Sequence, residues 1–260
     1  MKIFLFLILV FSPLFVFADQ IIKDKKFSPY TRYIDSNNLR IFALERVSDN
    51  FLIDVASIYG SMFNDNKMID PVMQKTYLKS LKKNYVYQRI GIIGPDDNPG
   101  FDCCPRSGRY QDNHTDFIWE NTDGSGTQAN EIIEHLLHTI TAVGFYYAFP
   151  KEWRWDKKNS PLILAMQEAI EKGIFDVSSY KEIRNKRDYL KITAQEFAYW
   201  MIIAEWNYFD LLIKDPYHPE FSVRSQSEMI KKLPLAHALY MNTVAKIMSA
   251  PEKSLLKKYQ

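Results

Sequence analysis

The segment from Thr127 to Val143 constrains the fold most, because it has two distinct faces when it is drawn as a helix. Seven apolar residues recur at spacings of three and four on one face: Ala129, Ile132, Ile133, Leu136, Leu137, Ile140 and Val143. Such a stripe must pack against a core, so we predict a helix that other elements hold on one side. The opposite face presents two carboxylates and two imidazoles: Glu131, Glu134, His135 and His138.

The spacing of these four polar residues has two interpretations. Carboxylates and imidazoles three or four residues apart can converge on one divalent ion, because their side chains lie one helical turn apart. The same spacing also gives ordinary pairs, Glu131 with His135 and Glu134 with His138. Each such pair stabilises an exposed helix by about 0.2–0.5 kcal/mol. The spacing alone therefore leaves open a metal site and a solvated helix face.

Strands and helices alternate before this segment, and helices dominate after it. We predict strands at 39–45, 86–93 and 116–121, with helices at 48–62, capped by Ser48, and from Asp70-Pro71 to about 84. Further helices are predicted at 161–173, 194–213 and 229–248, the last with a break at Pro234. This order predicts an α+β fold with a small mixed sheet in the N-terminal half and a mostly helical C-terminal half.

The pentapeptide Glu134-His135-Leu136-Leu137-His138 resembles the metal helix of the zincin metallopeptidases. Their motif is H-E-x-x-H, and here its first two letters are exchanged. The order of elements over roughly residues 39–210 is also similar to that fold. In the gluzincin branch a later helix supplies a third ligand, often in a segment resembling E-F-x-A, and Gln195-Glu196-Phe197-Ala198 fits this pattern. The resemblance implies a single zincin-like domain over residues 19–260 with a divalent metal ion on the helix 127–143.

The resemblance also implies a role for each residue. Mapped position by position, Glu134, His138 and Glu196 are the ligands, and His135 is the base that takes a proton from water. The family implies zinc, whereas two carboxylate ligands favour harder ions such as manganese or iron. A second mapping uses His135 and His138 as ligands together with Glu131 or Glu134. Depending on the mapping, His135 or Glu134 moves the proton.

The third ligand has an alternative interpretation. If the helix begins near Ala194, Thr193 and Glu196 form a capping box, in which the Glu196 carboxylate binds the backbone N–H of Thr193. That role would compete with metal binding for the same carboxylate. Glu205, nine residues further along, is the reserve candidate for the third ligand.

The resemblance implies a metal-dependent hydrolase that cleaves a peptide bond or a similar amide in a peptide or protein substrate. The alternative is a zincin-like module without catalysis, which binds a partner of the cell envelope through the turn-rich segment 94–113. The exchanged motif keeps this alternative open.

The N-terminus predicts export. Lys2 precedes an apolar run from Ile3 to Phe11, and a second apolar piece after Pro13 ends at Ala18, as in a signal peptide spanning residues 1–18. The run is shorter than the roughly 20 residues that span a bilayer, and no second long apolar run follows. We therefore expect a secreted or periplasmic protein with no membrane span after cleavage.

The remaining composition excludes other functions. The 33 basic and 31 acidic residues nearly cancel, and no extended basic block predicts a nucleic-acid partner. Cys103 and Cys104 are neighbours, so they cannot cross-link distant parts of the chain. The other histidines are weaker candidates. His114 could reach the metal helix or a substrate, although a lone loop histidine is more often solvated. His218 lies in a turn, and His237 is expected to be a half-buried helix residue.

Overall fold

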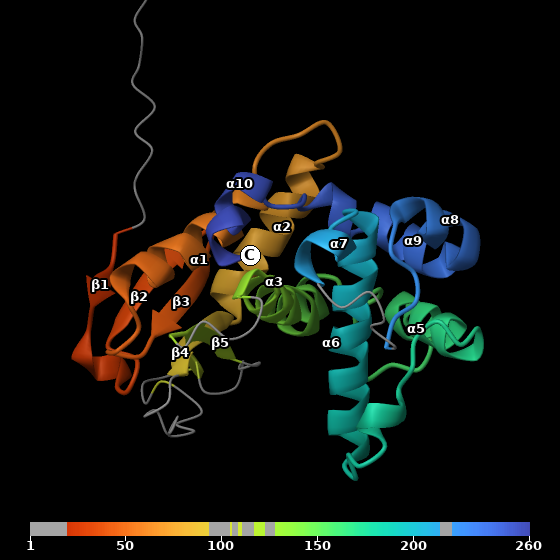
Figure 1. Cartoon of the computed structure of the whole chain (residues 1–260), viewed down its shortest axis with the longest axis horizontal. Helices are drawn as coiled ribbons and strands as arrows, with labels where there is room; N and C mark the ends of the chain where they lie inside the picture. The colour runs from red at the N-terminus through yellow and green to blue at the C-terminus, as the bar shows by residue number, and fades with distance from the viewer. Residues whose placement is uncertain (1–19, 94–104, 106–108, 111–116, 123–127, 214–219) are drawn as a thin grey trace, which may run out of the picture.

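The structure is a computed structural model that describes residues 20–93, 105, 109–110, 117–122, 128–213 and 220–260 (Figure 1). The predicted signal peptide, Cys103-Cys104, His114 and His218 lie outside the described residues. So does most of the segment 94–113. The interpretations of these parts therefore stay predictions.

The N-terminal half contains a mixed five-stranded sheet, in which the strands lie in the order β1 to β5. The first three strands pair antiparallel, and β3, β4 and β5 pair parallel. Their bounds are Ile22–Lys23, Arg32–Ser36, Leu39–Ala43, Tyr87–Ile93 and Phe117–Asn121. The predicted α+β fold with a small mixed sheet is confirmed, and three of the strands follow the predicted positions. The sequence did not predict β1 and β2.

Two helices connect β3 to β4, α1 (Asp49–Ser61) and α2 (Pro71–Lys83). Both begin at the predicted positions. The Ser48 hydroxyl accepts a hydrogen bond from the N–H of Phe51 at 3.2 Å, and the Asp70 carboxylate accepts from the N–H groups of Val72 and Met73. These side chains satisfy backbone donors that the first turn of a helix leaves unpaired.

The predicted central helix extends over residues 128–148. It comprises α3 (Gln128–His138), a π-helical segment (Thr139–Phe145) and a short α4 (Tyr146–Ala148). All seven residues of the predicted apolar stripe are buried. The π-helical segment begins directly after His138, and segments of this rare kind often occur at functional sites.

The C-terminal half is mostly helical, as predicted. Its helices are α5 (Pro161–Glu171), α6 (Lys186–Glu205), α7 (Phe209–Leu212), α8 (Gln226–Lys232), α9 (Pro234–Asn242) and α10 (Lys253–Leu256). Short 3₁₀ turns occupy Ser178–Tyr180, Val244–Lys246 and Lys257–Tyr259 in this half, and Lys25–Phe27 between β1 and β2. No helix among the described residues combines the length and apolar character needed to cross a bilayer.

Two predicted helices had wrong boundaries. The helix predicted at 194–213 begins at Lys186, where the Asn185 side chain caps it by accepting from the N–H groups of Arg187 and Asp188, and it ends at Glu205. The last predicted helix is divided before Pro234, as expected, but α8 begins at Gln226 and α9 ends at Asn242.

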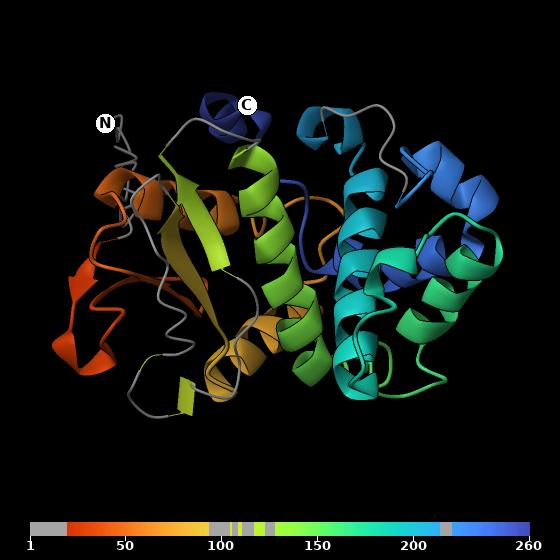
Figure 2. The ribbon, with the colours of Figure 1, turned by 60° about the horizontal axis from the view of Figure 1, so that its bottom comes forward.

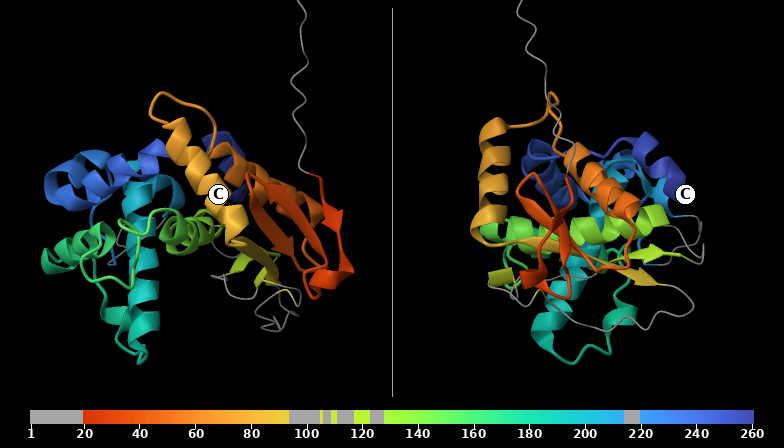
Figure 3. Two further views of the ribbon diagram at one scale, coloured as in Figure 1. Left: turned by 180° about the vertical axis from the view of Figure 1, so that it is seen from behind. Right: turned by 90° about the vertical axis from the view of Figure 1, so that its left-hand side faces the viewer.

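α3 lies between the edge strand β5 and α6, which it contacts on either side (Figure 2). The left view in Figure 3 shows the long helix α6 on the far side of α3 from the strands β1 to β3. One connected apolar core runs through these layers, from Ile34 in the sheet to Leu256 near the C-terminus. Packing on both sides therefore fixes the position of α3 and of its polar side chains.

Candidate metal centre

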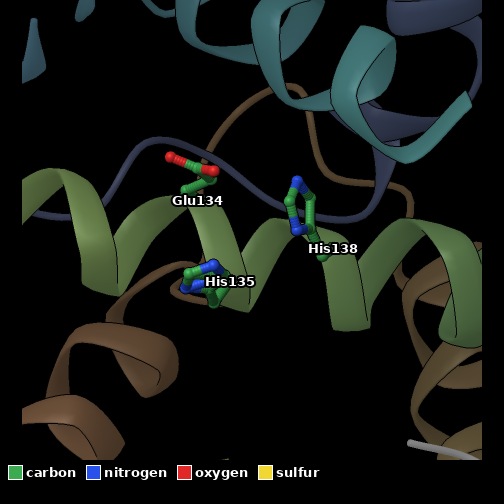
Figure 4. Close-up of side chains that lie close together, drawn as sticks. All are labelled: Glu134, His135 and His138. Carbon is green, nitrogen blue, oxygen red and sulfur yellow. The ribbon is translucent and has the colours of Figure 1, made fainter. Parts of the chain in front are cut away.

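Three polar side chains of α3 lie together. Each of Glu134, His135 and His138 offers a donor atom, and these atoms lie within 4.8 Å of one another. Figure 4 shows that Glu134 and His138 extend from the same side of the helix, one turn apart, and that His135 lies lower, in front of the helix. The rings of His135 and His138 are nearly perpendicular, with centroids 5.5 Å apart. A His/Glu group able to hold a metal ion is therefore present on this helix.

The imidazole of His138 is enclosed between α3 and α6. Its side chain is 1 % exposed, and its Nε2 atom lies 3.4 Å from Oε2 of Glu196, whose side chain is 15 % exposed. The side-chain amide of Gln195 approaches Nδ1 of the same ring at 3.5 Å. Both ring nitrogens of His138 thus face polar groups of α6, and the solvated-face interpretation does not hold for this residue.

The separation of His138 and Glu196 also suits metal binding. Two donor atoms bound at about 2.1 Å to one tetrahedral ion lie about 3.4 Å from each other. The observed distance of 3.4 Å between Nε2 and Oε2 matches that spacing. The downstream glutamate is therefore within reach of an ion held by His138.

The capping-box interpretation of Glu196 was wrong. Thr193 lies inside α6, and its hydroxyl donates to the carbonyl of Tyr189 at 2.7 Å. The N–H groups of a helix interior already bond to carbonyls one turn earlier, so no free backbone donor is available to Glu196 there. Its carboxylate faces His138 instead.

The carboxyl group of Glu134 has a strongly shifted pKa. Its pKa is raised from 4.5 to about 7, mainly by burial and in addition by the neighbouring carboxylates of Glu196 and Glu131, against the opposing effect of His138. The amide of Asn130 donates to Oε2 of Glu134 at 2.9 Å. Asn130 in turn accepts from the hydroxyl of Tyr199 on α6. Asn130 thus holds Glu134 in place, and a bound cation would stabilise its ionised carboxylate.

His135 has a different partner. Its Nδ1 atom lies 3.1 Å from Oε1 of Glu131. The same oxygen accepts from the backbone N–H of Trp119 in β5 at 2.9 Å. Glu131, a ligand candidate in the second mapping, therefore bridges His135 and the edge strand.

Glu205, the reserve candidate for the third ligand, contacts a different histidine. Its Oε1 atom lies 2.9 Å from Nδ1 of His237 on α9. The Glu205 side chain is fully buried, and that of His237 is 25 % exposed, in agreement with the half-buried helix residue predicted for it. Burial raises the pKa of Glu205, and the hydrogen bond to His237 opposes this shift.

The sequence analysis did not identify some residues of the site. Asn130 lies on α3 four residues before Glu134, a spacing that could have indicated its contact with that carboxylate. Gln195 and Tyr199 approach the polar cluster across the contact between α3 and α6, and no spacing within one helix indicates such contacts. The pair of Glu205 and His237 likewise joins α6 to α9. A model of helix packing would have been needed to find these contacts.

Comparisons of the chain with protein-family models, curated proteins and solved structures give no match. The functional argument therefore depends on the geometry and chemistry of this cluster.

Proposed function

We propose that Glu134, His138 and Glu196 bind a divalent metal ion, and that the protein is a metal-dependent hydrolase acting on peptide bonds or similar amides. The observation that supports this most directly is the 3.4 Å approach of the Glu196 carboxylate to Nε2 of His138. It adds a donor from α6 to the His/Glu group on α3. The order of elements and the exchanged motif support the zincin-like part of the proposal.

The charges of the three residues suit a divalent ion. Two carboxylates and one neutral imidazole carry two negative charges, which a divalent cation balances. In the metal-free protein the same carboxylates repel each other, and this repulsion contributes to the raised pKa of Glu134. Zinc is the ion that the resemblance implies, and the two carboxylates also suit manganese or iron.

The bound ion would polarise the carbonyl of the scissile bond and lower the pKa of a water molecule beside it. His135, next to the proposed ligands, would take a proton from this water as the oxygen attacks the carbonyl carbon. The same imidazole would then give the proton to the leaving amine as the C–N bond breaks. One water molecule is consumed, and His135 returns to its neutral form.

Metal analysis of the purified protein tests the site. We expect one ion per chain in the native protein and a loss of at least tenfold in affinity for His138→Ala and Glu196→Gln, measured by mass spectrometry and metal titration. Glu205→Gln is the matched control, because it removes a carboxylate of the same helix that also contacts an imidazole. Equal metal content in all four proteins would contradict the proposed ligands.

A peptide library offered to protein loaded with zinc, manganese or iron tests the reaction. Cleavage that is lost in His138→Ala would support the hydrolase. Metal binding without cleavage would favour the alternative function, a zincin-like module that binds a partner of the cell envelope. The predicted signal peptide supports a place of action outside the cytoplasm for either function.

A further inference from the structure

The contact of Glu131 with His135 defines which nitrogen of this imidazole carries a proton. Oε1 of Glu131 accepts from the backbone N–H of Trp119 at 2.9 Å and lies 3.1 Å from Nδ1 of His135. An ionised carboxylate can only accept hydrogen bonds. The contact with Nδ1 is therefore a hydrogen bond only when Nδ1 is protonated, which leaves the lone pair of a neutral His135 on Nε2.

The backbone of β5 holds Glu131 in this position. The N–H of Trp119 is part of the edge strand, next to α3, and it keeps the carboxylate oxygen on the Nδ1 side of the ring. A second side chain of α3, Gln128, makes similar bonds to β5. It accepts from the N–H of Asn121 and donates to the carbonyl of Trp119, both at 2.7 Å. Both side chains link α3 to β5, and Glu131 contacts an imidazole in addition.

We propose that Glu131 is a positioning residue that fixes His135 as the Nδ1–H tautomer, so that Nε2 is the nitrogen that accepts the proton of the attacking water. This inference rests on the proposed function. It also accounts for the exchanged motif, because a carboxylate hydrogen-bonded to an imidazole stabilises the imidazolium that forms when Nε2 is protonated. In the reaction Nε2 gains the proton of the water and later gives it to the leaving amine. The Nδ1–H group stays hydrogen-bonded to Glu131 throughout.

The test uses the metal-free full chain labelled with ¹⁵N-histidine, so it does not depend on metal binding. Imidazole ¹H–¹⁵N correlation spectra at pH 8 distinguish a protonated ring nitrogen from one with a lone pair, and His135→Gln assigns the signals of residue 135. We expect Nδ1 to be protonated in the native protein and in the control Gln128→Ala. Glu131→Gln should keep this tautomer, because an amide oxygen still accepts from Trp119 and Nδ1. Glu131→Ala should shift the population towards Nε2–H.

A native His135 with its proton on Nε2 would overturn the inference, whether or not the variants fold. An unchanged tautomer in a folded Glu131→Ala would also overturn it. In the metal-loaded protein we expect Glu131→Ala to lower kcat by about 10–100-fold at unchanged metal affinity. If Glu131→Ala instead lowered the metal affinity by a similar factor, His135 would belong among the ligands, and its role as the base would be contradicted. Absence of metal from the native protein would refute the proposed function, with the tautomer still measured separately.

Discussion

Glu134→Gln should stabilise the metal-free protein at neutral and alkaline pH. The folded-state pKa of Glu134 is about 7, against 4.5 for an unperturbed glutamate, mainly because the carboxyl group is buried. The folded protein therefore holds this proton more tightly than the unfolded chain does. By linkage, the free energy of unfolding falls as the pH rises from 4.5 to 7, and it stays lower above that range.

The size of the effect follows from the shift. A difference of about 2.5 pKa units, at 1.36 kcal/mol each, corresponds to a cost of about 3 kcal/mol at pH 8. Glutamine has nearly the same shape, carries no charge, and can still accept the hydrogen bond from Asn130. The variant should thus be more stable than the native protein by about 3 kcal/mol at pH 8 and about equally stable at pH 4.5. For a chain of this size, that gain corresponds to roughly 6–12 °C in Tm.

The assay is urea denaturation in the presence of a chelator, at several pH values between 4.5 and 8.5, with the exposed Glu182→Gln as control. A stability difference between native protein and Glu134→Gln that is the same at pH 5 and pH 8 would refute the linkage argument. Added zinc should narrow the difference, because the native protein gains about 2.7 kcal/mol at a free concentration of 100 Kd. The variant, which lacks a proposed ligand, should gain less.

Three further changes test the surroundings of the site. In Gly91→Ala the new methyl group would lie 2.4 Å from the ring of Trp119, so we expect a loss of about 1–3 kcal/mol in urea denaturation and a change in tryptophan fluorescence. An unchanged spectrum would show that the ring is not packed there. Ile133→Ala opens a cavity under α3 and should cost about 2–5 kcal/mol, measured in the same way. Tyr199→Phe removes the hydroxyl that binds Asn130, which should cost about 1 kcal/mol and weaken metal binding measurably by titration. Unchanged metal affinity would mean that this hydroxyl does not help to orient Glu134.

Local signals explain which parts of the fold the sequence predicted. Ser48 and Asp70 cap their helices through bonds to residues two or three positions away, and such signals are visible in the sequence. The buried stripe of α3 was equally predictable from its period. The hairpin of β2 and β3 was missed, although Asn37 and Asn38 at its turn both adopt left-handed backbone conformations, which asparagine tolerates better than most residues.

The start of α6 was missed for a different reason. Its first turn is largely exposed and polar, so the apolar period becomes visible only near Ala194. The local signal was the cap at Asn185, followed by Asp188 in the first turn, where a negative charge favours the helix N-terminus. The spacing of apolar residues indicates only the buried part of a helix. The exposed N-terminal turn of α6 therefore precedes the first residues that show this spacing.

The earlier start of α6 changes the chemistry that is available to its glutamates. In the helix interior the backbone donors are already bonded, so a poorly exposed carboxylate must find its partner on another element. Both Glu196 and Glu205 do this, and each contacts an imidazole, of His138 and His237 respectively. The two glutamates therefore share the carboxylate–imidazole contact and differ in what surrounds it. The distinction lies in the further donors that Glu134 and His135 offer beside His138, and for this reason metal binding should respond to Glu196→Gln and not to Glu205→Gln.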